Sequence, residues 1–95
     1  MFAVTVTFTI KPLQTKYFLY HIAQNAQTSL QTEPGCQQFD VCHDSSGTTV
    51  FLYEIYDTRA AFEAHMTTAH FKAFEHVTAQ MIDTKEVRLF EKVIR

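Results

Sequence analysis

The segment that most restricts the fold is Phe2–Ile10, in which five apolar residues alternate with alanine and threonine. A period of two predicts a β-strand with one face in the core. The opposite face has small or β-branched side chains and lacks the charges that a face in water normally carries. Lys11-Pro12 ends the strand, because proline has no N–H for a sheet ladder. We therefore expect a strand that is covered on both faces.

Two further strands and a helix follow from local patterns. Residues 13–31 contain no glycine or proline, and this stretch has apolar residues at helical spacing: Leu19, Ala23, Ala26 and Leu30, flanked by Phe18 and Ile22. Glu33-Pro34-Gly35 ends that helix, since a residue before proline disfavours helical angles. Strands are predicted at Cys36–His43 and Thr49–Tyr56, joined by a hairpin turn at Asp44-Ser45-Ser46-Gly47.

A broken helix is predicted from Arg59 to about Ile82. Phe71, Phe74, Val77 and Met81 form a buried stripe in its second half. Asp83-Thr84-Lys85 is interpreted as a polar turn, and the last strand is expected to begin near Val87 and to include Leu89 and Val93.

This β-α-β-β-α-β order indicates an α+β fold in which two helices cover one face of a four-stranded antiparallel sheet. The whole chain, residues 1–95, is expected to form a single domain. The other face of the sheet is expected to pack on a second copy across a two-fold axis, as a homodimer.

Composition excludes several classes of function. The formal net charge is −2 and the basic residues are scattered, so nucleic acid is not expected as a partner. No segment is long and apolar enough to span a membrane, and Phe2–Ile10 does not have the pattern of a secretory signal. Cys36 and Cys42 are six residues apart on one strand, about 20 Å, which rules out a disulfide between them. These features favour the cytoplasm.

Val50–Phe74 joins the most apolar strand to a helix that contains His65 and His70. Asp57 or Thr58 is expected to cap the helix start, and Thr67-Thr68 to interrupt it, with Thr68 capping a second segment. On one continuous helix, residues five apart would point roughly 140° away from each other. The interruption allows both histidines to face one cavity.

These residues carry a resemblance to a known family. From about Phe2 to Val93 the chain resembles the antibiotic biosynthesis monooxygenase superfamily, with the motifs Glu33-Pro34-Gly35-Cys36-x-x-Phe39-Asp40, Tyr53-Glu54-x-Tyr56 and Ala60-Ala61-Phe62-x-x-His65-x-x-x-x-His70-Phe71. The resemblance implies a dimeric α+β barrel of ferredoxin-like subunits. It also implies small-molecule chemistry without a cofactor, such as the oxidation of quinols or anthrones.

Metal, haem and thiol chemistry are disfavoured. A zinc-binding histidine pair on one helix is usually four residues apart, and a third ligand is not evident. Haem-degrading relatives use a tryptophan, which this chain lacks. His43 follows Cys42 but lies on the opposite strand face, so it cannot activate that thiol. We expect no flavin, haem or metal cofactor.

The remaining chemistry is acid and base catalysis in an apolar cavity. The candidate catalytic residues are His65, His70, Tyr53 and Glu54. The candidate substrate-binding residues are Asp40, Phe51, Phe71, Phe74, His21 and Arg88. His65 is expected to titrate near neutrality, because the C-terminal end of a helix favours its protonated form. Structural roles are the alternative: Tyr53 in the core, Glu54 paired with Arg88 or Lys92, Asp40 paired with Arg88, and His21 at the surface.

Three interpretations of function remain. The first is a cofactor-independent monooxygenase that oxidises a small quinol-like or polyketide-like aromatic substrate with molecular oxygen. The second is an isomerase or tautomerase of a small phosphorylated hydroxy-dione, for which Arg59, Lys72 and Arg88 are candidate phosphate ligands. The third is a non-catalytic dimeric module that binds a small ligand.

Overall fold

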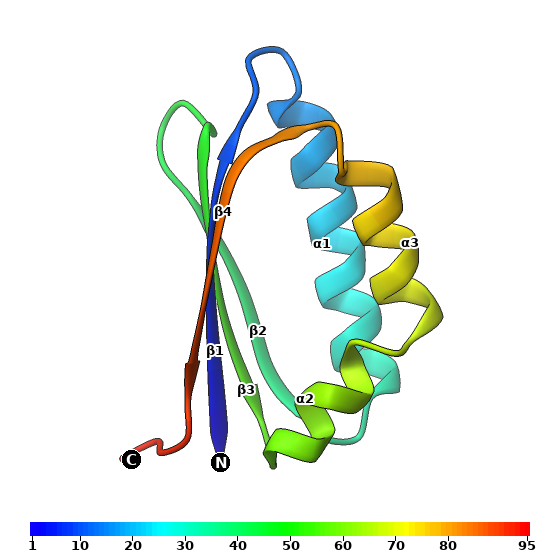
Figure 1. Ribbon diagram of the computed structural model, residues 1–95, viewed down its shortest axis with the longest axis vertical. Helices are drawn as coiled ribbons and strands as arrows, with labels where there is room; N and C mark the ends of the chain where they lie inside the picture. Colours follow the sequence, from blue (N-terminus) through cyan, green and yellow to red (C-terminus); the bar gives the residue numbers. More distant parts are fainter.

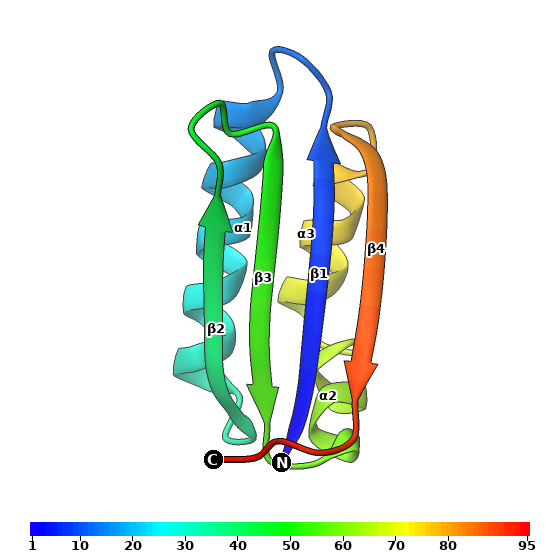
Figure 2. The same cartoon turned by 90° about the vertical axis from the view of Figure 1, so that its left-hand side faces the viewer.

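The computed structural model describes residues 1–95 and contains one four-stranded antiparallel sheet. Its elements in chain order are β1 (Phe2–Ile10), α1 (Thr15–Thr32), β2 (Cys36–His43), β3 (Thr49–Tyr56), α2 (Arg59–His65), α3 (Ala69–Thr78) and β4 (Ile82–Phe90). The strand order is β2-β3-β1-β4, which places β1 in the centre of the sheet (Figure 2). The predicted ferredoxin-like α+β fold is confirmed.

All three helices lie on one face of the sheet (Figure 1). The alternation in β1 explains the core: Phe2, Val4, Val6, Phe8 and Ile10 are buried beneath the helices. They join Phe18 and Ile22 of α1, Phe62 of α2 and Phe74 of α3 in one apolar cluster. No helix covers the opposite face, which is turned toward the viewer in Figure 2. No helix is long and apolar enough to cross a membrane.

Helix α1 forms where it was predicted, but its buried stripe differs from the expected one. The buried residues are Phe18, Ile22, Asn25, Ala26 and Ser29. Leu30 is 45% exposed, although it was expected in the stripe. Ser29 lies on the same face of α1 as Phe18 and Ile22 and is therefore buried with them. Its hydroxyl is satisfied by donating to the Asn25 carbonyl oxygen at 2.8 Å. Asn25 thus becomes a buried polar residue, which the sequence pattern did not predict.

The last strand was predicted to start too late. β4 begins at Ile82, so Asp83-Thr84-Lys85 is part of the strand and not a turn. It ends at Phe90, so Val93 lies beyond it. β4 is an edge strand whose residues are mostly exposed, so polar side chains are tolerated there. Lys85 pairs with Phe8 of β1 and holds its ammonium 5.8 Å from the centre of that ring.

Candidate functional site

The break between α2 and α3 is built by two threonines that cap helices. Thr58 accepts a hydrogen bond from the Ala61 N–H at 3.1 Å and starts α2, which ends at His65. Thr68 accepts from the Phe71 N–H at 3.2 Å and starts α3, and its hydroxyl donates to the His65 carbonyl oxygen at 2.7 Å. The predicted interruption and both predicted caps are confirmed.

The break brings His65 and His70 to one carboxylate, that of Glu33. His65 Nδ1 lies 2.8 Å from Glu33 Oε2, and His70 Nε2 lies 2.5 Å from the same oxygen. Glu33 caps the C-terminal end of α1 and its side chain is 12% exposed. The sequence pattern indicated Glu33 only as part of a motif. It precedes the two histidines by 32 and 37 residues, and no periodicity links them.

The same three side chains offer a possible set of metal ligands, since their donor atoms lie within 4.8 Å of one another. A third ligand was not evident from the sequence, and Glu33 supplies one. The distances nevertheless fit hydrogen bonds between the three side chains. Ligands of one zinc ion with bonds of about 2.1 Å would lie roughly 3.4 Å apart in tetrahedral geometry. The cluster is therefore a carboxylate that accepts hydrogen bonds from two imidazole rings.

His65 is buried, with 2% of its surface exposed. Its ring lies among aromatic rings, with centroids 5.0 Å from Phe71 and 5.4 Å from Tyr56. Burial lowers the pKa of His65, and Glu33 opposes this by stabilising the charged form. The end of α2 was expected to favour the protonated form, but burial shifts the pKa of His65 in the opposite direction. Nε2 has no hydrogen-bond partner within the protein, and burial favours the neutral form of His65.

A second buried acid lies on β3. Glu54 is 3% exposed, and its Oε1 accepts a hydrogen bond from the Tyr56 hydroxyl at 2.6 Å. Burial raises the pKa of Glu54 from 4.5 to about 7, while the bond from Tyr56 acts in the opposite direction. Burial also raises the pKa of Tyr56. The carboxyl group of Glu54 can thus hold or release a proton near neutral pH.

Both acid–base groups line a cavity of about 370 Å³ between the sheet and the helices, called here the inner cavity. Its walls are mainly apolar side chains from β1, β3, α2 and α3, including Phe62, Phe71 and Phe74. The polar residues in its wall are Asn25, Glu54, His65, Glu75 and Lys85. The inner cavity therefore combines a neutral imidazole and a titratable carboxyl group with an apolar lining.

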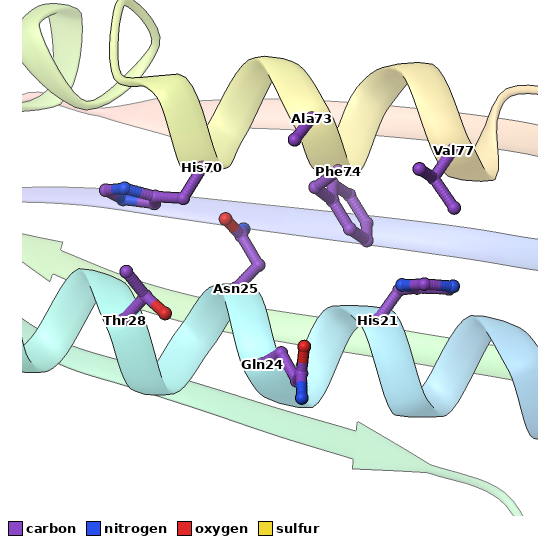
Figure 3. A pocket seen from close by; sticks show the side chains of 8 residues that line it. All are labelled: His21, Gln24, Asn25, Thr28, His70, Ala73, Phe74 and Val77. Carbon is purple, nitrogen blue, oxygen red and sulfur yellow. The ribbon is translucent and has the colours of Figure 1, made fainter.

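A smaller depression of about 170 Å³, called here the helix groove, lies between α1 and α3 (Figure 3). His21 and Gln24 of α1 and His70 and Val77 of α3 are among its lining residues. Asn25 and Phe74 line both spaces. His21 therefore lies at the opposite end of the helix groove from His70 (Figure 3) and does not line the inner cavity.

Residues 1–77 match the sequence profile of the family described as antibiotic biosynthesis monooxygenase. The chain belongs to the antibiotic biosynthesis monooxygenase family. Among solved structures, it is similar to a protein of Nitrosomonas europaea provisionally assigned as an antibiotic biosynthesis monooxygenase. The two share 26% identity over 99% of this chain and 100% of that one, with a TM-score of 0.91.

A second similar structure is described as an antibiotic biosynthesis monooxygenase. It shares 23% identity over 99% of this chain and 100% of its own, with a TM-score of 0.88, and at that identity it supports the fold alone. No curated protein matches the chain. Family membership and fold are thus established for this antibiotic biosynthesis monooxygenase family member, while its substrate is not identified by these similarities.

Four predicted site residues of this family member lie on the uncovered face of the sheet, away from the histidines. Tyr53 pairs with Asp40 of β2 and with Thr5 of β1, and Thr5 pairs with Arg88 of β4. Phe51 lies on the same face, opposite Thr7. Their placement in the histidine cavity is wrong because adjacent strand residues point to opposite faces, so Glu54 and Tyr53 cannot both face the helices.

The structure also corrects the expected partners of Glu54. Arg88 lies on the uncovered face, and Glu54 bonds instead to Tyr56 beneath the helices. Of the predicted residues, the fold therefore brings His65, Glu54, Phe71 and Phe74 together around the inner cavity. His70 joins His65 through Glu33.

Proposed function

We propose that this protein is a cofactor-independent monooxygenase that oxidises a small quinol-like or polyketide-like aromatic substrate with molecular oxygen. The observation that carries the proposal is the hydrogen bond from His65 Nδ1 to Glu33, which leaves Nε2 without a partner in the wall of an apolar cavity. Membership of the antibiotic biosynthesis monooxygenase family supports the reaction class.

Glu33 determines which nitrogen of His65 can act as a base. A carboxylate accepts hydrogen bonds, so Nδ1 carries the proton and Nε2 carries the lone pair. A carboxylate in this position also stabilises the imidazolium that forms when Nε2 takes a proton, as in other histidine–carboxylate pairs. His70 donates to the same Glu33 oxygen and so helps to hold it in place.

The proposed reaction begins when His65 Nε2 removes a proton from a phenol or an activated carbon of the substrate. The resulting anion is electron-rich and transfers one electron to oxygen, and the substrate radical and superoxide combine into a peroxide anion at carbon. This anion takes back the proton held by His65 and becomes a hydroperoxide. At a methylene carbon, loss of the remaining C–H proton and cleavage of the O–O bond then give a carbonyl group and water. The substrate itself supplies all the electrons. One atom of the oxygen molecule ends in the carbonyl group and the other in water.

Glu54 supplies the complementary acid. With a pKa of about 7, its carboxyl group is partly protonated at neutral pH and can donate to a developing oxygen anion. The Tyr56 hydroxyl bonds to Oε1 and holds the group in one orientation. The aromatic walls suit a planar ring, and about 370 Å³ is within the usual range of small-molecule sites.

An isomerase is the second candidate, because a base and an acid in one cavity can also move a proton between two carbons of a hydroxy-dione. The expected phosphate ligands Arg59, Lys72 and Arg88 do not line the inner cavity. Arg59 is instead paired with Glu91 at 2.7 Å. Lys85 is the cation in the cavity wall, so it is the candidate for binding a phosphate in this alternative.

Oxygen uptake tests the proposal. Purified protein is added to anthrone or 1,4-dihydroxynaphthalene in an oxygen electrode, and products are identified by mass spectrometry. A monooxygenase consumes one oxygen molecule per turnover and adds one oxygen atom to anthrone. Conversion of a phosphorylated hydroxy-dione without oxygen uptake would establish the isomerase instead. Ligand binding without any turnover would overturn both and leave a binding module.

A further inference from the structure

We propose that the side-chain amide of Asn25 is a ligand subsite, which binds a second oxygen substituent on an aromatic ligand in the inner cavity. This inference rests on the proposed function, because it takes the inner cavity as the substrate site. It specifies the ligand class further: a planar aromatic with one oxygen near His65 and Glu54 and another that reaches Asn25.

The amide of Asn25 has no partner within the protein. Asn25 is 5% exposed, and its Oδ1 is the buried side-chain nitrogen or oxygen atom left without a hydrogen bond. Each of the other buried polar side chains makes at least one hydrogen bond: Ser29 and Thr78 donate to carbonyl oxygens of their own helices, and Glu54 and His65 bond to Tyr56 and Glu33. A buried amide without a partner is unfavourable, and such exceptions require an explanation.

The position of Asn25 suits a ligand contact. It lies in the buried stripe of α1 and lines both the inner cavity and the helix groove. Figure 3 shows its side chain extending from α1 toward α3, between His70 and Phe74. The neighbouring amide of Gln24 bonds to the Tyr20 hydroxyl, to which its Nε2 donates at 2.9 Å, and makes no hydrogen bond to Asn25. Asn25 is thus the polar group that α1 contributes to the wall of the inner cavity.

The chemistry of an amide fits both ends of the proposed reaction. Asn25 can accept a hydrogen bond from a phenolic hydroxyl and donate one to a quinone carbonyl. A ligand held at His65 by one oxygen and at Asn25 by another would be fixed at two points, and the apolar walls would hold its ring between them. A site built to bond a substituent discriminates against ligands that lack it.

The test compares two probes and two substitutions under argon, where no turnover occurs. Binding of 1,4-dihydroxynaphthalene and of 1-naphthol is measured by isothermal titration calorimetry. Wild-type protein is expected to bind the diol more tightly. Asn25→Leu has similar volume but no polar atoms, and it should weaken binding of the diol roughly 3- to 10-fold while leaving 1-naphthol unchanged. Asn25→Ala repeats the comparison if the leucine does not fit.

Thermal unfolding provides an independent readout. Removing an unsatisfied amide should raise the melting temperature of Asn25→Leu by a few degrees, roughly 4 °C, so the variant would be more stable and bind less well. Gln24→Leu, one residue away, is the control. It should change neither the preference for the diol over 1-naphthol nor the affinity for either probe. An unchanged diol preference in both Asn25 variants would overturn the proposal, as would failure of the wild-type protein to bind either probe.

The outcomes separate this inference from the proposed function. Loss of the diol preference in Asn25→Leu without any oxygen uptake by wild-type protein would keep the subsite and reject the monooxygenase. Oxygen uptake with an unaltered preference in the variant would keep the monooxygenase and reject the subsite.

Discussion

One carboxylate determines what two histidines from different helices can do. Glu33 accepts hydrogen bonds from Nδ1 of His65 and Nε2 of His70, so each ring directs an N–H toward it. His65 is nearly fully buried, whereas the side chain of His70 is 20% exposed. The ring that is shielded from water and faces the inner cavity is therefore His65, and His70 supports Glu33 from outside.

Glu33→Gln should lower the pKa of His65 further. The carboxylate stabilises the imidazolium by charge and by hydrogen bonding, and an amide in its place provides only a weak acceptor. We expect turnover to fall roughly 10²-fold, because the imidazolium formed in catalysis is no longer stabilised. NMR titration of the His65 ring measures the pKa. Glu63→Gln, at an exposed site on α2, is the control. An unchanged pKa in Glu33→Gln would contradict the assigned role of Glu33.

Glu54→Gln should change how stability depends on pH. The folded-state pKa of Glu54 is raised from 4.5 to about 7, so between these values the folded protein keeps a proton that the unfolded chain has released. The free energy of unfolding of the wild type therefore falls as pH rises through this range, by about 3 kcal/mol in total. The glutamine still accepts from Tyr56 but does not titrate.

Urea denaturation at a series of pH values measures this effect. Relative to the wild type, Glu54→Gln should gain stability from pH 4.5 to pH 8 and then remain level. The titration of His65 acts on both proteins and cancels in the difference. A difference that stays constant with pH would show that Glu54 is not protonated in the folded protein near neutrality.

At the scale of elements, the α2–α3 break is the feature that creates the site. Thr68 accepts from the Phe71 N–H and donates to the His65 carbonyl oxygen, so one side chain both starts α3 and holds the end of α2. His70 is in the first turn of α3, directly after this cap. The position of His70 near Glu33 therefore depends on Thr68.

Thr68→Ala should destabilise the protein by about 1 kcal/mol, the usual effect of losing a helix cap. The first turn of α3 would fray, and amide hydrogen exchange at Phe71 would become faster. Thr67→Ala is a matched control, because Thr67 only donates to the Ala64 carbonyl oxygen at 2.7 Å and caps no helix. Equal exchange rates at Phe71 in the two variants would contradict the role of Thr68.

Much of this architecture follows from local sequence patterns. The alternation in β1, the hairpin between β2 and β3, and the threonine caps of α2 and α3 are all local signals, and each was predicted. The start of β4 was missed, since polar residues on an edge strand have the same composition as a turn.

The site was only partly predictable, because it depends on contacts between distant residues. Period-two alternation places Tyr53 and Glu54 on opposite faces of β3, but both faces of that strand contain apolar residues, so the sequence does not tell which one faces the helices. Glu33 meets His65 and His70 only because the end of α1 lies beside the break between α2 and α3. Such a meeting leaves no periodic signal in the chain.

At the scale of the whole molecule, one face of the sheet has no helical cover (Figures 1 and 2). Phe51 is 38% exposed there and Phe90 is 42% exposed. Between them lie the uncharged residues Thr5, Thr7 and Thr9 of β1, which are only half-buried. A sheet face with exposed aromatic residues around an uncharged central strand is typical of an interface between two copies of a chain.

We expect the protein to be a homodimer that is held together through this face. Light scattering should give twice the mass of the chain at micromolar concentrations. Phe51→Lys places a positive charge in this face of each copy and should produce monomers, whereas Leu30→Lys, an exposed residue on α1, should leave the dimer intact. A wild-type protein that stays monomeric across micromolar concentrations would contradict the expected barrel.

The central claim is that His65 is the base in the inner cavity, and His65→Asn tests it most directly. Asparagine keeps an N–H for Glu33 and has no basic nitrogen. Oxygen uptake with 1,4-dihydroxynaphthalene should fall roughly 10²- to 10⁴-fold, the usual contribution of one positioned base. His70→Ala should have a smaller effect, and His76→Ala, exposed on α3, should have none. Full turnover in both the His65 and His70 variants, with loss of turnover in His21→Ala, would contradict the account and place the site in the helix groove.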